Sequence, residues 1–271
     1  MKSPVTVITG SASGIGLHLT TVLAGRGHRV IATDLNERGL HEASEKNRWS
    51  DANVLIEKLD VTNESDWESV LDRAESAFGR VELLLNVAGA LKPGKVVDLE
   101  ARDIDLHLTV NVKGTVLGTR AAARRMVSAG SGHIVNIGSL ASLAPVPGLS
   151  LYCASKFAVR GFTLAAATEL AEYGVAVSLV MPDAVQTPML DLQVAYEEAA
   201  LTFSGSRPLT VDEIVQVIVD EVLAKRPLEV TVPLGRGLLA RAANAAPGMS
   251  QLLYPMLKKK GLAAQAKAKR S

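Results

Sequence analysis

The feature that most constrains the fold is a regular alternation of short apolar segments with longer helix-patterned segments. The short segments are rich in Val, Ile and Leu, as buried strands are, and lie at 5–9, 29–33, 54–59, 81–85, 133–137, 175–180 and 229–232. The segments with helical patterning lie at 17–24, 64–78, 102–129, 151–173 and 210–224. This alternation predicts an α/β protein with a doubly wound parallel sheet of about seven strands and helices on both faces.

The composition supports one globular domain with an extension. The chain has 271 residues, of which 48% are hydrophobic and 21% charged, and this excludes a mostly disordered protein. We expect a single dinucleotide-binding and catalytic domain over 1–233 and an amphipathic, basic extension over 234–271. Residues 1–229 hold 21 Lys/Arg and 28 Asp/Glu, whereas residues 230–271 hold 8 Lys/Arg and no acid.

Three roles are open for the basic extension. Its leucines, together with Lys258, Lys259 and Lys260, can rest on an anionic membrane surface. Equally, the extension can cover the mouth of a substrate site or dock on a neighbouring subunit, with the last dozen residues left as solvated coil. Nucleic acid is not an expected partner, because no aromatic residue is interleaved with the lysines.

From the sequence we expect a cytoplasmic protein. We see no signal-peptide pattern at the start, and no apolar run reaches the roughly 18 residues of a membrane span. The single cysteine, Cys153, permits no internal disulfide and fits a reducing compartment. The five histidines have no ligand spacing, so we expect no metal site.

A glycine-rich loop separates the first strand from the first helix. It reads Gly10-Ser-Ala-Ser-Gly14-Ile-Gly16, which is not the Gly-x-Gly-x-x-Gly spacing. Glycines permit a tight turn and close backbone approach to a ligand, and a helix N-terminus favours a pyrophosphate. The loop therefore indicates a nucleotide site, with an ordinary turn as the alternative.

Asp34 ends the second predicted strand, eighteen residues after Gly16. A carboxylate there can accept hydrogen bonds from an adenosine ribose and would repel the 2′-phosphate of NADP. Arg38 is the one nearby cation that argues the other way. We expect NAD(H) rather than NADP(H), although Asp34 can also be a turn residue that caps the helix beginning near Glu37.

Tyr152 and Lys156 lie four residues apart on a predicted helix, which places both side chains on one face. An ammonium beside a phenol favours the phenolate and lowers a pKa that is normally about 10. Tyr152 can then exchange a proton with a substrate oxygen that Ser139 holds by a hydrogen bond. Taken alone, the spacing is more often an ordinary amphipathic helix start, so the pair needs support from the rest of the chain.

That support comes from the ends of the predicted strands, where ligands bind in parallel sheets. The residues at these ends are Gly10, Asp34, Asp60, Asn86, Ser139 and Pro182. With these pieces in place, the chain closely resembles the short-chain dehydrogenase/reductase family, which has a Rossmann-type sheet. The matching pieces are Thr9-Gly-Ser-Ala-Ser-Gly-Ile-Gly16, Asp60-Val61, Asn86-Val-Ala-Gly89, Asn111, Ser139, Tyr152-Cys-Ala-Ser-Lys156 and Pro182-x-x-Val-x-Thr187.

The resemblance implies a catalytic set with assigned roles. Tyr152 is the general acid/base, Ser139 orients the substrate oxygen, Lys156 holds the nicotinamide ribose, and Asn111 supports a proton-relay water. It also implies a homodimer or homotetramer built on the helices that begin near Arg102 and Leu151. The implied cofactor contacts are Gly10, Ser13, Gly14, Ile15, Gly16, Asp34, Leu35, Asp60, Val61, Asn86, Ala88, Gly89, Tyr152, Lys156, Pro182, Val185 and Thr187.

The sequence departs from the family pattern at two positions. Val87 replaces the second residue of Asn-Asn-Ala-Gly, and Asp183 stands where glycine usually follows the proline. A carboxylate so near a pyrophosphate is unfavourable unless it points away or is paired.

The expected function is hydride transfer between nicotinamide and a hydrophobic secondary alcohol or ketone of lipid, steroid, terpenoid or 3-oxoacyl type. The expectation rests on a set of apolar residues without a charged anchor: Leu140, Leu143, Val146, Leu149, Met189, Leu190, Leu192 and Tyr196. As an alternative, several of these residues can form core or a subunit interface. The alternative function is a non-catalytic NAD-binding sensor or scaffold.

Overall fold

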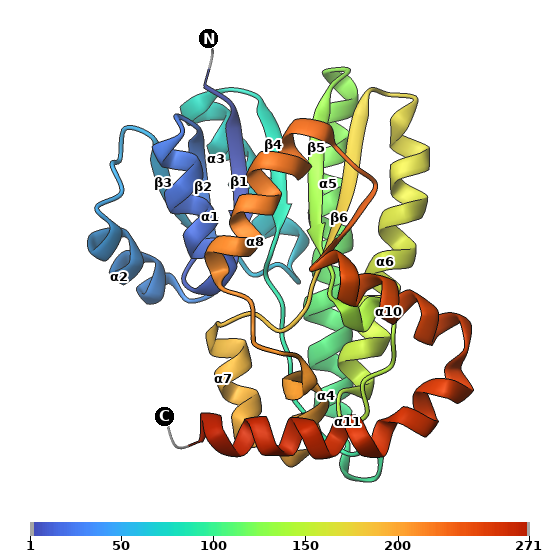
Figure 1. Ribbon diagram of the computed structural model, residues 1–271. Coiled ribbons are helices and arrows are strands. Elements are labelled where there is room, and N and C mark those ends of the chain that lie inside the picture. Colours follow the sequence, from blue (N-terminus) through green and yellow to red (C-terminus); the bar gives the residue numbers. More distant parts are fainter. Residues whose placement is uncertain (1–2, 270–271) are drawn as a thin grey trace.

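The computed structural model describes residues 3–269, which form a parallel seven-stranded sheet covered by helices on both faces (Figure 1). The strands are β1 (Val5–Thr9), β2 (Arg29–Asp34), β3 (Val54–Lys58), β4 (Val81–Asn86), β5 (Gly132–Ile137), β6 (Val175–Pro182) and β7 (Glu229–Val232). Their order across the sheet is β3-β2-β1-β4-β5-β6-β7, with every neighbouring pair parallel. The predicted doubly wound α/β fold is confirmed.

The helices follow the predicted alternation. They are α1 (Gly14–Gly25), α2 (Glu37–Asn47), α3 (Glu64–Phe78), α4 (Ala101–Leu106), α5 (Gly114–Ser128), α6 (Ser150–Ala171), α7 (Pro188–Val194), α8 (Val211–Val217), α9 (Leu223–Lys225), α10 (Leu234–Ala245) and α11 (Pro247–Ala268). Two π-helical segments, η2 (His107–Lys113) and η5 (Ile218–Val222), join α4 to α5 and α8 to α9. Short 3-10 turns are η1 (Val96–Asp98), η3 (Leu140–Ser142) and η4 (Glu197–Ser204).

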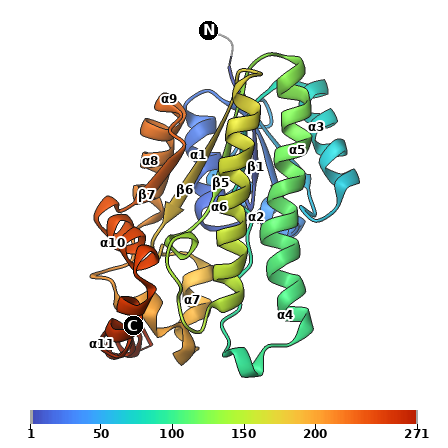
Figure 2. The same ribbon diagram turned by 90° about the vertical axis from the view of Figure 1, so that its right-hand side faces the viewer.

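Apolar side chains cover both faces of the sheet, as continuous apolar strands require. On one face Leu19 of α1, Leu40 of α2 and Ile214 of α8 pack against the strands. On the other face Trp67 of α3 and Met126 of α5 pack against them. Figure 2 shows the two helical layers on opposite sides of the sheet.

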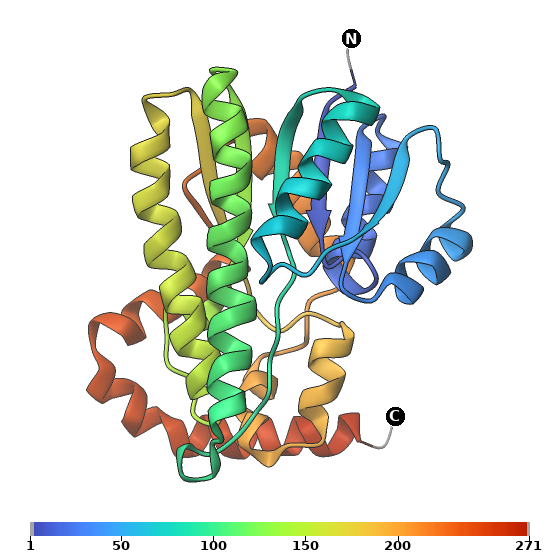
Figure 3. The same cartoon turned by 180° about the vertical axis from the view of Figure 1, so that it is seen from behind.

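The C-terminal helices lie outside these layers. Figures 1 and 3 place α11 across the lower end of the molecule, beside α7. This end is where the strands terminate, so the extension lies over the edge at which parallel sheets bind ligands.

The possibility that the last dozen residues form solvated coil is wrong for the part that the structure describes. Helix α11 continues to Ala268, and the Gln265 side chain is buried. Its Nε2 donates hydrogen bonds to the backbone oxygens of Gln193 and Tyr196, at 2.9 and 2.7 Å. These bonds hold the last turns of α11 against the body. Within residues 3–269 no helix is both long and apolar enough to cross a membrane.

Close packing between α3 and α5 gives a stability prediction. A Cβ atom on Gly118 of α5 would lie 2.5 Å from the indole ring of Trp67 and 2.6 Å from Asn86 Oδ1. Because Trp67 is almost fully buried, the ring has no free space to move into. We expect Gly118→Ala to lower the free energy of unfolding by about 1–3 kcal/mol, measured by urea denaturation. Gly25→Ala is the control, since a Cβ there meets no atom within 4 Å, and an equal loss in both variants would contradict the packing argument.

Candidate active site

A cavity of about 1120 Å³ opens at the carboxyl ends of the strands. It brings together residues that lie far apart in the sequence, from the loop after β1 to helix α11. Every residue that the sequence analysis assigned to the cofactor or to catalysis lines this cavity, with the exceptions of Asn86 and Asn111.

The glycine loop forms an open cradle at one end of the cavity. Gly10 and Gly14 have φ angles of +72° and +53°, a backbone region that glycine adopts without strain. Gly16 has no room for a Cβ atom because the Gly10 carbonyl lies against it. The first turn of α1 contains no acid, and its N-cap residue Ser13 makes no side-chain capping bond. The N-terminal N–H groups of α1 therefore suit a pyrophosphate.

Asp34 is fixed at the end of β2, on the edge of the same cavity. Its Oδ2 accepts a hydrogen bond from the Ala12 N–H at 3.0 Å, and its Oδ1 accepts one from the Asn36 N–H at 2.9 Å. The cap of α2 is Asn36 rather than Asp34. The capping alternative for Asp34 is therefore wrong. Nearby Arg38 forms an exposed ion pair with Glu42 at 2.8 Å.

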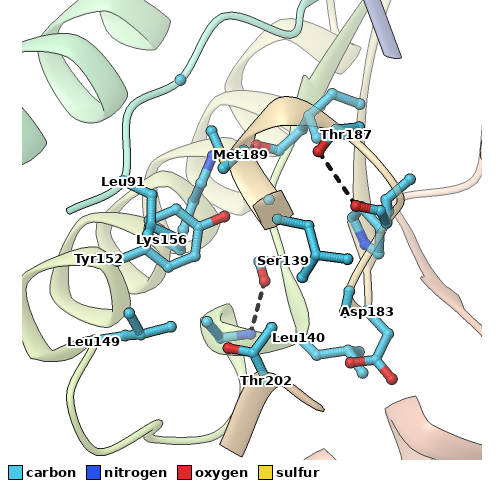
Figure 4. Close-up of a pocket in the computed structure, with 18 of the residues that line it drawn as sticks. Leu91, Ser139, Leu140, Leu149, Tyr152, Lys156, Asp183, Thr187, Met189 and Thr202 are labelled. Atoms are coloured by element: carbon cyan, nitrogen blue, oxygen red, sulfur yellow. Dashed lines mark hydrogen bonds between the residues drawn. The ribbon is translucent and has the colours of Figure 1, made fainter. Parts of the chain in front are cut away.

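Ser139 and Tyr152 line the same cavity (Figure 4). Ser139 follows β5, where its Oγ accepts a hydrogen bond from the Ala141 N–H at 3.1 Å. Tyr152 lies in the first turn of α6 and is 8% exposed. Burial raises the pKa of Tyr152 to about 12, and interaction with the Ser139 side chain offsets only part of this rise.

Lys156 lies one turn further along α6 and is also buried. Its Nζ donates a hydrogen bond to the Ile137 carbonyl at 2.9 Å and lies 5.6 Å from the centre of the Tyr152 ring. Burial lowers the pKa of Lys156 to about 8. The expected net lowering of the Tyr152 pKa is thus wrong, because desolvation is the largest influence on this pKa and raises it.

Asn111 and Asn86 lie behind the cavity wall. Asn111 is fully buried within the π-helical segment η2. Its Oδ1 accepts a hydrogen bond from the Ala90 N–H at 2.7 Å, and its Nδ2 donates to Ala90 O and Ser155 Oγ, both at 2.9 Å. Asn86 donates to Asn136 Oδ1 at 2.8 Å, inside the sheet. Both amides hold cavity-forming segments in place.

The unusual Asp183 is paired. Its Oδ2 lies 2.5 Å from Nε of Arg236 in α10, and its Oδ1 accepts a hydrogen bond from that guanidinium at 3.4 Å. The sequence analysis required a carboxylate at this position to point away from the pyrophosphate or to be paired, and Asp183 is paired. The pairing also connects the C-terminal extension to the end of β6.

The predicted apolar set divides between the cavity and other environments. Its cavity members are Leu140, Val146, Leu149, Met189 and Leu190. Leu143 instead packs in a core cluster with Val159 and Leu179. Leu192 and Tyr196 are exposed on the surface by 46% and 36%.

Sequence reasoning assigned no role to several residues that the structure places at the cavity. Thr9 Oγ1 accepts hydrogen bonds from the N–H groups of Val87 and Ala88, both at 2.9 Å. Its position as the polar last residue of an apolar strand was a usable signal. Gln193, whose Oε1 accepts a hydrogen bond from Thr202 at 2.9 Å, also lines the cavity and had no sequence signal.

Comparison with known proteins agrees with this geometry. The family described as short chain dehydrogenase matches residues 4–197. A cyclopentanol dehydrogenase from Comamonas sp. (strain NCIMB 9872) is 34% identical over 82% of this chain and 91% of its own length. A 3-alpha-(or 20-beta)-hydroxysteroid dehydrogenase from Mycobacterium bovis is 37% identical over 69% of this chain and 71% of its own.

A solved structure gives the same result in three dimensions. The crystal structure of a short chain dehydrogenase/reductase from Burkholderia phymatum in complex with NAD superposes with a TM-score of 0.82 at 27% identity. The match covers 92% of this chain and 95% of that chain. Sequence, sheet topology and relatives therefore agree that this chain belongs to the short-chain dehydrogenase/reductase family of NAD(P)-dependent oxidoreductases.

Proposed function

We propose that this oxidoreductase interconverts a hydrophobic secondary alcohol and its ketone, with NAD(H) as the preferred cofactor. The observation that carries the proposal is a single cavity in which Ser139, Tyr152 and Lys156 face apolar walls. Among the charged residues that line it, Asp183 and Arg236 are neutralised by each other. The names of two relatives, a cyclopentanol and a hydroxysteroid dehydrogenase, support the same substrate class.

In this proposal Tyr152 transfers the proton and Ser139 positions the oxygen that receives it. During ketone reduction the Tyr152 hydroxyl gives its proton to the carbonyl oxygen, while the Ser139 hydroxyl donates a hydrogen bond to that oxygen. The raised pKa of Tyr152, about 12, keeps this proton on the phenol at neutral pH. In the reverse direction the phenolate accepts the alcohol proton, and the positive charge of Lys156 stabilises it.

The cofactor has a binding residue for each of its parts. The glycine loop, formed by Gly10, Ser13, Gly14, Ile15 and Gly16, would hold the pyrophosphate. Residues Asp34, Leu35, Asp60 and Val61 would hold the adenosine end. Residues Ala88, Gly89, Pro182, Val185 and Thr187 would hold the nicotinamide end, with Lys156 on its ribose. The bound nicotinamide supplies the hydride chemistry.

Asn111 and Asn86 take part indirectly. Asn111 holds the loop at Ala90 against α6, which carries Tyr152. The Asn111 backbone carbonyl accepts a hydrogen bond from Thr115 Oγ1 at 2.7 Å, and in this proposal the same oxygen supports a relay water. Asn86 fixes the start of the segment that leads to Gly89.

The preference for NAD(H) rests on Asp34. Its carboxylate is held by two backbone N–H groups at the position where a ribose diol would bind, and a 2′-phosphate there would meet a negative charge. Arg38, the one cation that argued for NADP(H), is neutralised by Glu42.

A second copy of the chain is the proposed protein partner. Helix α4 and segment η2 leave Ile104, Leu106 and Leu108 exposed by 41%, 38% and 43%. These apolar side chains lie on the helix that begins near Arg102, and a homodimer or homotetramer would cover them.

An anionic membrane surface is the proposed partner of the extension. Helix α11 exposes Leu252 and Met256 by 81% and 63%, and Lys259 follows on the same helical face. Within residues 3–269, Lys258, Lys259 and Lys260 form no ion pair. Each is therefore free to contribute about 1 kcal/mol at an anionic surface.

Replacing Tyr152 by Phe tests the catalytic assignment. We expect Tyr152→Phe to lower kcat for ketone reduction by about 100- to 10,000-fold, because the proton donor is lost. NADH binding, followed by fluorescence titration, should stay within about twofold of wild type. Tyr173→Phe makes the same chemical change at an exposed position outside the cavity and should leave kcat unchanged. Full activity in Tyr152→Phe would refute the role of the phenol.

Titration with NADH and NADPH tests the role of Asp34. Wild type should bind NADH at least about tenfold more tightly, a difference of about 1.4 kcal/mol. Asp34→Asn, which keeps an acceptor for the Asn36 N–H but removes the charge, should reduce that ratio. Arg38→Ala is the control and should leave the ratio unchanged. Tighter NADPH binding by wild type would overturn the assignment.

Sedimentation tests both partner proposals. In buffer the protein should sediment at twice or four times 28.6 kDa, and Leu108→Glu should reduce that mass.

With phosphatidylserine vesicles the protein should pellet at low salt, and replacing Lys258, Lys259 and Lys260 by Glu should abolish pelleting without changing the mass in buffer. A monomeric wild type, or vesicle binding insensitive to salt, would contradict the respective proposal.

A further inference from the structure

The C-terminal extension forms part of the cavity that contains Tyr152. Helix α10 contributes Leu239, Ala240 and Ala243, and helix α11 contributes Leu253 and Leu257. None of these residues lies in the part of the chain that matches the family, which ends at residue 197. The cavity therefore includes a region that the family model does not cover.

Charge in this region is confined to one ion pair, and the region reaches the surface. Its one charged side chain, Arg236, is paired with Asp183. Ala243 and Ala246, both half-buried, present only methyl groups to the cavity. Leu239 and Leu253 line the cavity and are also exposed, by 68% and 47%. The apolar space thus extends from the buried phenol to solvent beside these two leucines.

The walls of this region are fixed to the body of the protein. Helix α10 is held by the Asp183–Arg236 pair at 2.5 Å and by the Glu229–Arg241 pair at 3.0 Å. Helix α11 lies so close to η4 that a Cβ atom on Gly261 would overlap the Ala200 carbonyl. Gln265 adds two hydrogen bonds to backbone oxygens. The space between the helices is therefore a built part of the fold.

We propose that the space lined by Ala243, Ala246, Leu253 and Leu257 is a distal subsite for the unbranched hydrocarbon chain of the substrate. This inference rests on the proposed reaction, in which the reacting carbon lies beside Tyr152. A compact ring ketone would occupy only the region near Tyr152 and leave the alanines of α10 uncovered. A chain leads from the phenol along α10 to the opening between Leu239 and Leu253, and buries apolar surface along its whole length.

A series of straight-chain 2-ketones tests the subsite in the full-length enzyme. From 2-pentanone to 2-undecanone, kcat/KM should rise by up to about fourfold for each methylene that is buried. Ala243→Phe should fill the subsite and remove most of this rise, while kcat/KM for cyclopentanone stays within about twofold. Asn244→Phe places the same ring on the neighbouring exposed residue, outside the cavity, and should keep the rise.

Binding measured without turnover separates the two proposals. Calorimetry with 2-undecanone and the NAD⁺-loaded enzyme, which has no hydride to transfer to the ketone, should give a negative heat-capacity change in wild type and Asn244→Phe, and weaker binding in Ala243→Phe. If Ala243→Phe fails to fold by thermal unfolding, Ala246→Leu serves in its place. Turnover of ketones without any dependence on chain length would overturn the subsite alone. Chain binding with no turnover of any ketone would overturn the proposed reaction and keep the subsite.

Discussion

The site depends on the parallel pairing of β1 with both β2 and β4. Strands β2 and β4 lie on opposite sides of β1. The connections that leave β1 and β4 therefore run to opposite sides and open a crevice at the carboxyl end of β1. Thr9 fixes this point, since its hydroxyl accepts hydrogen bonds from two N–H groups of the segment after β4. The glycine loop, Asp34 and the Val87–Gly89 segment all owe their common location to that arrangement.

Burial shapes the chemistry as strongly as proximity does. Tyr152 and Lys156 share a helix turn, yet desolvation acts on each in the direction of its neutral form, raising one pKa and lowering the other. A hydrogen bond from Lys156 Nζ to the Ile137 carbonyl, at the end of β5, offsets part of the desolvation cost of the ammonium. Asn111 adds a buried amide whose bonds join the Ala90 loop to α6. The reacting groups are therefore held by polar contacts whose energies are high in a medium of low dielectric constant.

The C-terminal extension brings two opposite charges together as an ion pair. Arg236 belongs to a tail without acids, and Asp183 interrupts a segment that usually carries glycine; each alone is unfavourable beside an apolar cavity. Together they form a pair that holds α10 at the mouth. Glu229 has the same function further along, accepting from both Arg160 and Arg241. Arg236 and Arg241 thus attach the basic tail to the body, whereas Lys258, Lys259 and Lys260 on α11 face solvent.

The sequence by itself determined the fold class, because strand-length apolar runs alternate with helical ones. It also placed Gly10, Asp34 and Ser139 at strand ends or just after one, and Tyr152 near the start of a helix. Those features are local, and local periodicity is readable. Tertiary structure alone decided the rest. It assigned Leu143 to the core and Leu149 to the cavity, reversed the expected pKa shift of Tyr152 through burial, and paired Asp183 with Arg236. Each of these depends on contacts between segments distant in sequence, which no spacing of residues encodes.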